Sequence, residues 1–367
     1  MTTPALRALR DSVPGRRITL LTSAGGAAIT GMVPELDETV TYDAPWVKAT
    51  GERADSRADL AMVERLRGGR FDAAVIFTVY SQNPLPAAML CYLADIPLRL
   101  AHCHENPYRL LTTWVPDPEP AGLVRHEVRR QLDLVAAAGA STRNERLSLR
   151  VPPHAMSDVR GRLFAEGIDP HGRFVVIHPG ASAPSRRYPP ESFAAAARQL
   201  AAIARCPIVF TGSDGERELV EGIRREMGAA SVSLAGRLSL QGMAALLALA
   251  PVLVSNNTGP VHMAAALGTP VVDLYGLTNP QHAPWQVPSR VLFHDVPCRY
   301  CYKSVCPQQH HGCLRGVSPD DVARAAMELL DRDWERDPAG DGQELPRLVV
   351  PEVLLPPPTT PLSGGQA

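Results

Sequence analysis

The sequence lacks several features that would assign it to a specialised class of protein. Its formal net charge is −1, so overall charge gives no reason to expect nucleic acid or an anionic membrane surface as a partner. It has no apolar run long enough to span a bilayer, and its first residues lack the basic region and apolar core of a signal peptide. Its seven cysteines, an odd number, do not suggest the disulfide framework of a secreted protein. These absences predict a cytoplasmic protein.

The sequence does contain a regular alternation of short apolar strands and helical patterns. Its 367 residues, 45% hydrophobic and 20% charged, favour two globular domains. Helical patterns separate the strands of the carboxyl half, which predicts an α/β fold with a parallel sheet covered by helices on both faces. Strands are expected there at 174–178, 208–211, 232–234, 252–255 and 271–275, and helices at 190–204, 215–227, 240–249, 260–267 and 319–330.

The amino-terminal half shows the same alternation less sharply. Strands are expected at 18–22 and 73–78, and helices at 3–10, 85–93 and 123–138. We interpret 101–117 as a long functional loop. These patterns predict one domain at 1–145, a connection at 146–172, a second domain at 173–330 and a charged, Pro-rich, largely disordered tail at 331–367.

A polar turn between two apolar strands is the most informative motif. Asn257, Thr258 and Gly259 follow the strand at 252–255 and open the next helix. Ligands bind at this end of the strands in an open α/β sheet, and the free amides and positive dipole of a helix start suit a phosphate or diphosphate. An ordinary strand–helix turn with an Asn or Thr cap would have the same sequence.

Two further loops follow neighbouring strands. After 174–178 comes the small-residue run Gly180-Ala181-Ser182, which lets a ligand approach the backbone, and then Arg186-Arg187, which offers fixed donors to phosphate oxygens. A plain surface loop with a solvated arginine pair is the alternative. After 208–211 comes Glu216, which either complements the dipole of the helix it opens or accepts hydrogen bonds from ribose hydroxyls.

Together, these three loops resemble glycosyltransferase family 9, the group typified by ADP-heptose:lipopolysaccharide heptosyltransferases. That family carries a G-A-S loop with a basic residue and a W-P pair, a T-G-x-x-x-E segment, and a D-T-G-P-x-H-x-A-A-A-L-G-T-P run. The matching residues here are Gly180–Ser182 with Arg186, Thr211-Gly212 with Glu216, and 257–262 with 264–270. The resemblance covers about residues 170–330 well and is looser before them.

The resemblance implies a GT-B architecture, in which two Rossmann-like domains face a cleft. The carboxyl-terminal domain would bind a nucleotide-diphosphate sugar and the amino-terminal domain a glycan, lipid-linked or small-molecule acceptor. Transfer would invert the anomeric centre and require no cofactor, with no nucleic acid partner and at most peripheral contact with the inner face of a membrane. Two residues are implied to be catalytic, Arg186 and His262, although a buried helix histidine satisfied by the backbone is the alternative for His262. The implied donor-binding residues are Gly180, Ala181, Ser182, Glu216, Asn257, Thr258 and Gly259.

The chain departs from the family pattern at three places. Asn257 replaces the usual Asp and so removes a charge, and Arg186 replaces the usual Lys and so changes the geometry of a cation. Family members also open with a strand and a Gly-Asp turn whose Asp is the general base, whereas this chain starts inside the following helix. We therefore expect a gap in the centre of the amino-terminal sheet, no carboxylate in the base position and poor activity, with Asp43 and Glu105 as weak substitute bases.

Four cysteines form a separate signal within the loop at 297–313. The thiols of Cys298, Cys301, Cys306 and Cys313, as thiolates, suit a tetrahedral structural zinc. Their spacing is irregular, so reduced buried thiols or a labile disulfide are the alternatives.

Two rival functions fit the same sequence. The chain could bind a nucleotide-sugar without transferring it, because the family's base is absent, or it could be a GT-B sugar epimerase. Donor hydrolysis separates the binding protein from a transferase, because a binding protein retains the nucleotide without turnover.

Overall fold

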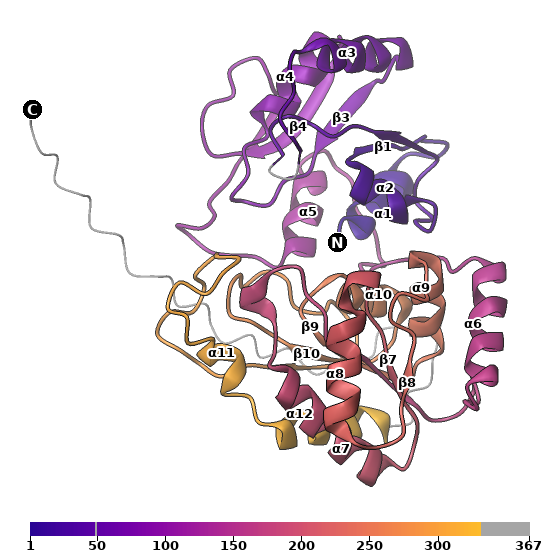
Figure 1. Cartoon of the computed structure of the whole chain (residues 1–367). Helices are drawn as coiled ribbons and strands as arrows, with labels where there is room; N and C mark the ends of the chain where they lie inside the picture. Colours follow the sequence, from indigo (N-terminus) through magenta and orange to yellow (C-terminus); the bar gives the residue numbers. More distant parts are fainter. Residues whose placement is uncertain (48–49, 332–367) are drawn as a thin grey trace, which may run out of the picture.

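A six-stranded parallel sheet forms the centre of the carboxyl-terminal lobe in the computed structural model, which describes residues 1–47 and 50–331 (Figure 1). Its strand order is β11-β10-β9-β6-β7-β8. The strands are β6 (Val175–His178), β7 (Ile208–Phe210), β8 (Val232–Ser233), β9 (Val252–Asn256), β10 (Val271–Leu274) and β11 (Ser289–Leu292). The predicted tail lies outside the described residues from position 332 onward.

Helices cover both faces of this sheet, as its sequence requires. Val175 and Ile177 face one core, whereas Val176 between them faces the other, and all three side chains are buried. The first core is closed by α7 (Pro190–Ala204), α8 (Arg217–Met227) and α12 (Pro319–Leu330), and the second by α6 (Pro153–Ala165), α9 (Leu240–Leu249) and α10 (Gly259–Leu267). Short turns of helix add η1 (Pro184–Arg186), η2 (Asp214–Glu216) and α11 (Gly312–Arg315).

The amino-terminal lobe holds two separate parallel sheets. One pairs β1 (Thr19–Thr22) with β2 (Glu38–Thr41), and the other has the order β3 (Ala73–Ile76), β4 (Leu98–Cys103), β5 (Thr113–Pro116). Within the described ranges no strand bridges the two sheets, so the expected gap in this lobe is observed. Its helices are α1 (Thr3–Ser12), α2 (Ala24–Thr30), α3 (Arg57–Gly69), α4 (Leu85–Leu93) and α5 (Glu127–Ala136).

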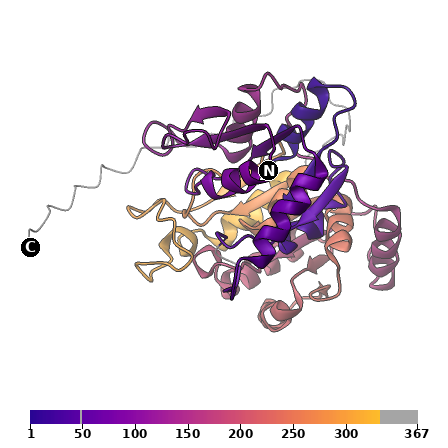
Figure 2. The same cartoon turned by 90° about the horizontal axis from the view of Figure 1, so that it is seen from above.

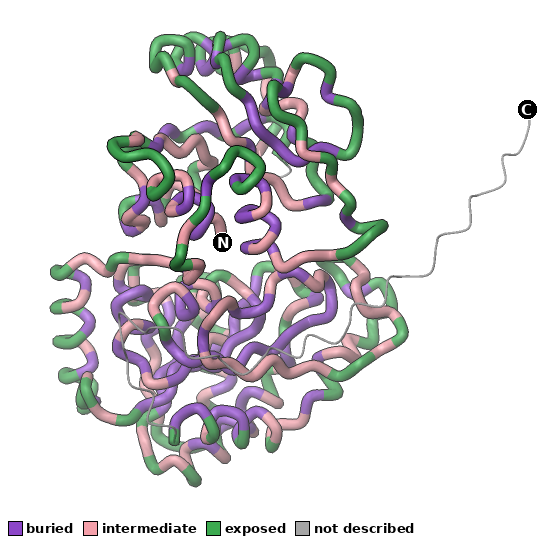
Figure 3. The backbone as a smooth tube through the Cα atoms, turned by 180° about the vertical axis from the view of Figure 1, so that it is seen from behind, coloured by how far each residue is buried: buried purple, intermediate pink, exposed green. Residues whose placement is uncertain are grey.

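The two lobes are joined through α5 and the chain after β10. The backbone N–H of Glu127 donates to Gln281 O at 3.0 Å, and the His126 ring lies against Trp285 with centroids 4.5 Å apart. Figures 1 and 3 show Met1 between the lobes, and Figure 2 shows α6 standing at one side of the molecule. Two α/β lobes facing each other agree with the implied GT-B architecture. None of the helices in the described ranges has the length and apolarity that crossing a membrane requires.

Two sequence-based expectations need correction. The segment 101–117 is not one long loop, because it contains the end of β4 and all of β5. His102, which suggested a polar loop, lies buried within β4, where its Nε2 is 3.2 Å from Arg130 O. The helix expected from residue 123 begins at Glu127, since His126 caps it through Nδ1. The predicted connection at 146–172 contains the helix α6. The exact domain boundaries stay a prediction.

Candidate functional site

The three loops singled out in the sequence lie at one edge of the large sheet. They follow β9, β6 and β7, which are neighbours in that order, so their carboxyl ends are adjacent. Asn256 Nδ2 donates to Pro179 O at 2.7 Å, and His178 Nδ1 lies 3.0 Å from Thr211 Oγ1. These bonds connect the loop after β6 to the carboxyl ends of β9 and β7.

The loop after β6 contacts the loop after β7 at Gly180 and Glu216. Glu216 Oε2 accepts from the backbone N–H of Ser213 at 2.7 Å and from its hydroxyl at 2.9 Å, which makes a capping box. A Cβ atom placed on Gly180 would lie 2.0 Å from Glu216 Oε1. Position 180 must therefore be glycine for the carboxylate to stay where the capping box holds it.

A methyl group at position 180 tests this arrangement. Gly180→Ala is expected to push the Glu216 carboxylate out of its capping bonds, because the 2.0 Å separation leaves no room for a side chain. The carboxylate is the movable end of its side chain, so the cost is mainly that of the lost capping bonds, about 0.5–2 kcal/mol of stability, and nucleotide affinity should fall with it. Thermal unfolding with and without ADP measures both effects. Gly215→Ala is the matched control, since a Cβ there meets nothing within 4 Å; equal behaviour of the two variants would contradict the packing argument.

Arg186 is the arginine that faces the end of β10. Its Nε donates to Thr278 Oγ1 at 3.2 Å and its Nη2 to Asn279 Oδ1 at 2.9 Å. Gly276 lets the backbone at Ser185 and Arg186 pack against the chain that follows β10, since a Cβ at position 276 would lie 2.9 Å from Ser185 O. Arg187 instead folds back and donates to Ala181 O at 2.8 Å. Arg186 therefore faces the site, whereas Arg187 holds the loop. Ser182, in the same loop, is exposed.

The start of α10 provides amides that no side chain caps. Thr258 is the N-cap residue, but its side chain makes no capping bond, and its Oγ1 is buried without a partner among the described residues. Pro260 occupies the first turn. Pro260 has no N–H, and the Val261 N–H donates to Thr258 O at 3.1 Å, so the Gly259 N–H is the first-turn amide of α10 that stays available to an anion.

His262 lies in the first turns of α10 with a buried ring nitrogen. Its Nδ1 has no hydrogen-bond partner in the described structure, so the alternative of a histidine satisfied by the backbone does not hold for this atom. Burial, assisted by the charges of the Met1 amino group, His282, His126 and Arg186, lowers the pKa of His262 to about 3. The ring is therefore neutral at pH 7 and offers a hydrogen bond rather than a charge.

Asp273 is a buried carboxyl that the sequence reading missed. It lies in β10, its side chain is 0% exposed, and burial raises its pKa to about 8 against the opposing effects of Asn257 and Arg186. The available signal was an acidic residue inside an otherwise apolar strand, because such residues are seldom fully buried without a reason.

Unpartnered buried polar atoms gather where the lobes meet. On the amino-terminal side they are Thr78 Oγ1, Glu127 Oε2 and Gln131 Oε1, and on the carboxyl-terminal side Thr258 Oγ1, His262 Nδ1, Asp273 Oδ1 and Gln281 Oε1. Buried polar groups are normally hydrogen-bonded, so this concentration indicates a place where a polar ligand or water completes the bonding.

The cysteine-rich loop brings its four thiols near one another and contacts the site through Ser185. All four thiols are free, and Cys298 Sγ lies 3.5 Å from His310 Nε2. No set of three or more His, Cys, Asp or Glu side chains in the described ranges is arranged to hold a metal. The loop positions Arg186 instead, since Ser185 donates through its backbone N–H to Ser304 O at 3.0 Å and through its hydroxyl to Lys303 O at 2.7 Å.

The two weak candidate bases lie in exposed positions with partners of their own. Asp43 Oδ1 accepts from the backbone N–H of Ala24 at 2.9 Å, and Glu105 Oε1 accepts from Asn83 Nδ2 at 2.8 Å. Glu105 borders a pocket of about 140 Å³ that also includes Tyr80 and His104. No contact in the described structure joins either carboxylate to Arg186 or His262.

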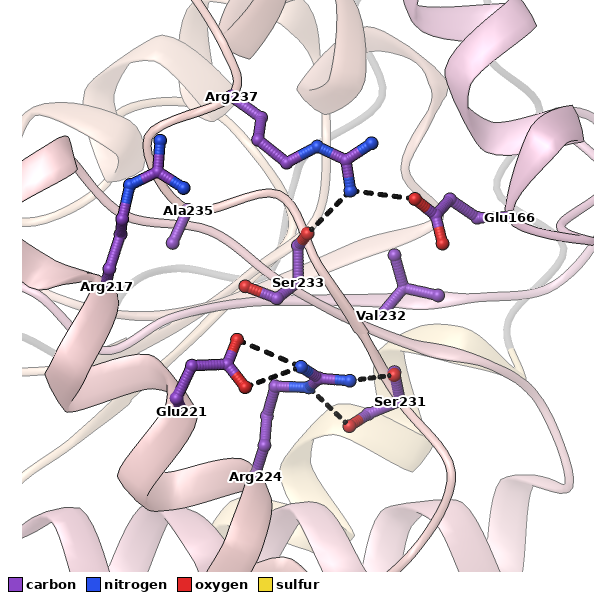
Figure 4. Close-up of a pocket in the computed structure, with 9 residues that line it drawn as sticks. All are labelled: Glu166, Arg217, Glu221, Arg224, Ser231, Val232, Ser233, Ala235 and Arg237. Atoms are coloured by element: carbon purple, nitrogen blue, oxygen red, sulfur yellow. Dashed lines mark hydrogen bonds and ion pairs between the residues drawn. The ribbon is translucent and has the colours of Figure 1, made fainter.

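A larger cavity, of about 340 Å³, opens beyond the edge strand β8 (Figure 4). Three arginines line it, but each is paired with a carboxylate, at 2.6 Å for Arg217 with Asp214 and at 2.7 Å for both Arg224 with Glu221 and Arg237 with Glu166. Arg224 and Arg237 also donate to Ser231 O and Ser233 O, which covers exposed strand carbonyls. The arginines of this cavity are therefore already paired with carboxylates of the chain.

Comparisons with known proteins agree with this geometry. The sequence model of glycosyltransferase family 9 (heptosyltransferase) matches residues 60–311. Lipooligosaccharide heptosyltransferase 2 of Campylobacter jejuni is 28% identical over 42% of this chain, which spans 50% of that relative's length. Lipopolysaccharide heptosyltransferase 2 of Salmonella typhimurium is 25% identical, with 89% of this chain and 93% of the relative covered.

Two solved structures share the fold. A glycosyltransferase family 9 protein from Veillonella parvula superimposes with a TM-score of 0.73 at 21% identity and covers 90% of this chain and 92% of its own. The E. coli ADP-heptose lps heptosyltransferase II superimposes with a TM-score of 0.68 at 23% identity and covers 90% and 94%. At such identities these likenesses establish the GT-B arrangement of the two lobes.

Proposed function

The chain belongs to glycosyltransferase family 9, and we propose that it is an inverting heptosyltransferase-type enzyme with a nucleotide-diphosphate sugar as donor. The observation that carries this proposal is the meeting of Arg186, the uncapped start of α10 and the Glu216 loop at one edge of the sheet, beside unpartnered polar atoms from both lobes. In the proposed complex the diphosphate lies at Arg186 and the start of α10, the ribose at Glu216, and the sugar beside them.

In the proposed reaction an acceptor hydroxyl attacks the anomeric carbon on the face opposite the leaving nucleoside diphosphate, which inverts that centre. The negative charge that develops on the diphosphate is stabilised by Arg186 and by the Gly259 N–H at the positive end of α10, without a metal. Neutral His262 donates or accepts a hydrogen bond near the donor phosphates or sugar. Glu216 Oε1, the oxygen that its capping box leaves free, accepts from the ribose. The donor would also contact the backbone of four small residues, Gly180, Ala181, Ser182 and Gly259.

The names of the relatives suggest the partners of the reaction. They are lipopolysaccharide and lipooligosaccharide heptosyltransferases, and one related structure contains ADP-2-deoxy-2-fluoro heptose. We propose that this chain uses a nucleotide-heptose and a glycan or lipid-linked acceptor, in the cytoplasm or at the inner face of the membrane.

A donor panel tests the proposal and its rivals. Purified protein is mixed with ADP-, GDP- and UDP-linked sugars, and the shift in thermal midpoint identifies the nucleotide, because a ligand that binds only the folded state stabilises it. Products are then analysed with acceptor present and absent. A transferase makes a glycosylated acceptor of inverted configuration, a binding protein leaves the donor intact, and an epimerase changes the donor sugar without an acceptor.

A structural zinc at Cys298, Cys301, Cys306 and Cys313 stays a prediction. Binding would need the loop to rearrange, because the described residues hold no preformed metal group. If the four thiolates bind zinc, purified protein should contain about one metal per chain, and a chelator should loosen the loop. Metal-free protein with all four thiols titratable in the native state would contradict this.

A further inference from the structure

Asp273 lies in an unusual place for a carboxyl group. It occupies β10, opposite Ser255 of β9 and Val291 of β11, in a sheet covered by helices on both faces. Its side chain is 0% exposed, and its Oδ1 has no hydrogen-bond partner among the described residues. Burying such a group is costly unless it is compensated, so its contacts are informative.

The contact that Asp273 makes is with the loop that opens α10. Asn257 Nδ2 donates to Asp273 Oδ2 at 2.8 Å and to His282 O at 2.9 Å. A backbone carbonyl only accepts, so the amide nitrogen of Asn257 must face His282, and Asp273 takes the second amide proton. Reversing the amide would set its oxygen against that carbonyl. The orientation of Asn257 is therefore fixed.

The fixed amide leaves its oxygen available. No described residue donates to Asn257 Oδ1, and this atom is not among the buried polar atoms that lack a partner. The backbone of Asn257 is also held, since its N–H donates to Leu274 O at 3.1 Å. Position 257 directly precedes the uncapped start of α10, so it presents a hydrogen-bond acceptor, and not a donor, at the proposed donor site.

We propose that Asp273 is a positioning residue for donor specificity, which holds the Asn257 amide so that Oδ1 accepts a hydrogen bond from one hydroxyl of the donor sugar. The inference rests on the proposed function of this site. Asp273 itself touches no substrate, and the group that it orients selects sugars with a free hydroxyl at that point.

The test uses ADP-heptose and a set of its monodeoxyfluoro analogues, in which fluorine replaces each hydroxyl in turn and cannot donate. Dissociation constants are measured for the full chain and two variants. Wild type should bind one analogue about tenfold more weakly than ADP-heptose, which is the effect of one lost hydrogen bond. Asp273→Leu removes one of the two acceptors of the amide and leaves it held by His282 O, so it should weaken ADP-heptose binding and reduce that discrimination. Asp273→Asn keeps an acceptor oxygen beside Asn257 and should retain the discrimination.

An exchange of the two side chains provides a second test. Asn257→Asp sets carboxylate oxygens against both Asp273 and His282 O and should weaken ADP-heptose binding; adding Asp273→Asn supplies an amide that donates to the new carboxylate, which should restore part of the binding. Unchanged discrimination in a folded Asp273→Leu, or no restoration in the double variant, would overturn the inference. If plain ADP also fails to bind wild type, the proposed function fails; if ADP binds all variants alike, a failure concerns Asp273 alone.

Discussion

Replacing Arg186 with alanine is expected to reduce sugar transfer about 10²–10³-fold, equivalent to about 2.7–4 kcal/mol in the barrier. The guanidinium is held by Thr278 and Asn279 beside the uncapped start of α10, where we place the leaving diphosphate. Charge accumulates on that group only as the bond to the sugar breaks, so the loss should appear mainly in kcat. Steady-state kinetics with the donor identified by the panel provide the measurement.

Two companion variants make this result specific. Arg186→Lys retains the positive charge and should recover much of the lost rate, whereas Glu216→Ala should mainly raise the KM for the donor, because its carboxylate is assigned to the ribose. If Arg186→Ala and Glu216→Ala both turn over normally, the site is placed wrongly.

The fold could be predicted best where the signals are local. The helices α4, α7 and α9 have the bounds expected from the sequence, and Ser318 caps α12 by accepting from the Asp321 N–H at 3.1 Å. The strands β2, β5 and β11 were missed because each is four residues long and lies at a sheet edge, where half-exposed residues give no continuous apolar run. The central strand β4 was missed for another reason, since Arg99 and His102 interrupt its apolar run.

In the candidate site, too, local features could be predicted from the sequence and contacts between distant segments could not. Its three loops could be predicted because each carries its own small or polar residues directly after a strand. The partners of those residues could not, since Asp273 and Asn279 reach Asn257 and Arg186 only through the pairing of strands distant in sequence. The sequence does show a glycine at a strand end, Gly276, and an acidic residue within a strand, Asp273. Neither feature indicates which residue it contacts.

The buried carboxyl of Asp273 leads to the second large effect, a dependence of stability on pH. Its pKa rises from an ordinary value of 3.8 to about 8 on folding, chiefly through burial. A group with a raised folded pKa contributes most below its unfolded pKa, and that contribution is lost as pH rises toward 8. The pKa of the nearby Tyr275 is also raised, chiefly by burial, so this residue does not reverse the trend.

Asp273→Asn should therefore stabilise the protein increasingly between about pH 4 and pH 8, with a plateau above, because an amide does not titrate. Each unit of pKa shift is worth about 1.4 kcal/mol, so the gain in unfolding free energy should reach a few kcal/mol. Denaturant unfolding at pH 4.5, 6, 7.5 and 9 (about one and a half units apart) follows it, with the exposed Asp72→Asn as a control that should stay flat. A gain that does not change with pH would mean that Asp273 is ionised in the folded protein, held by Arg186 and Asn257 against the effect of burial.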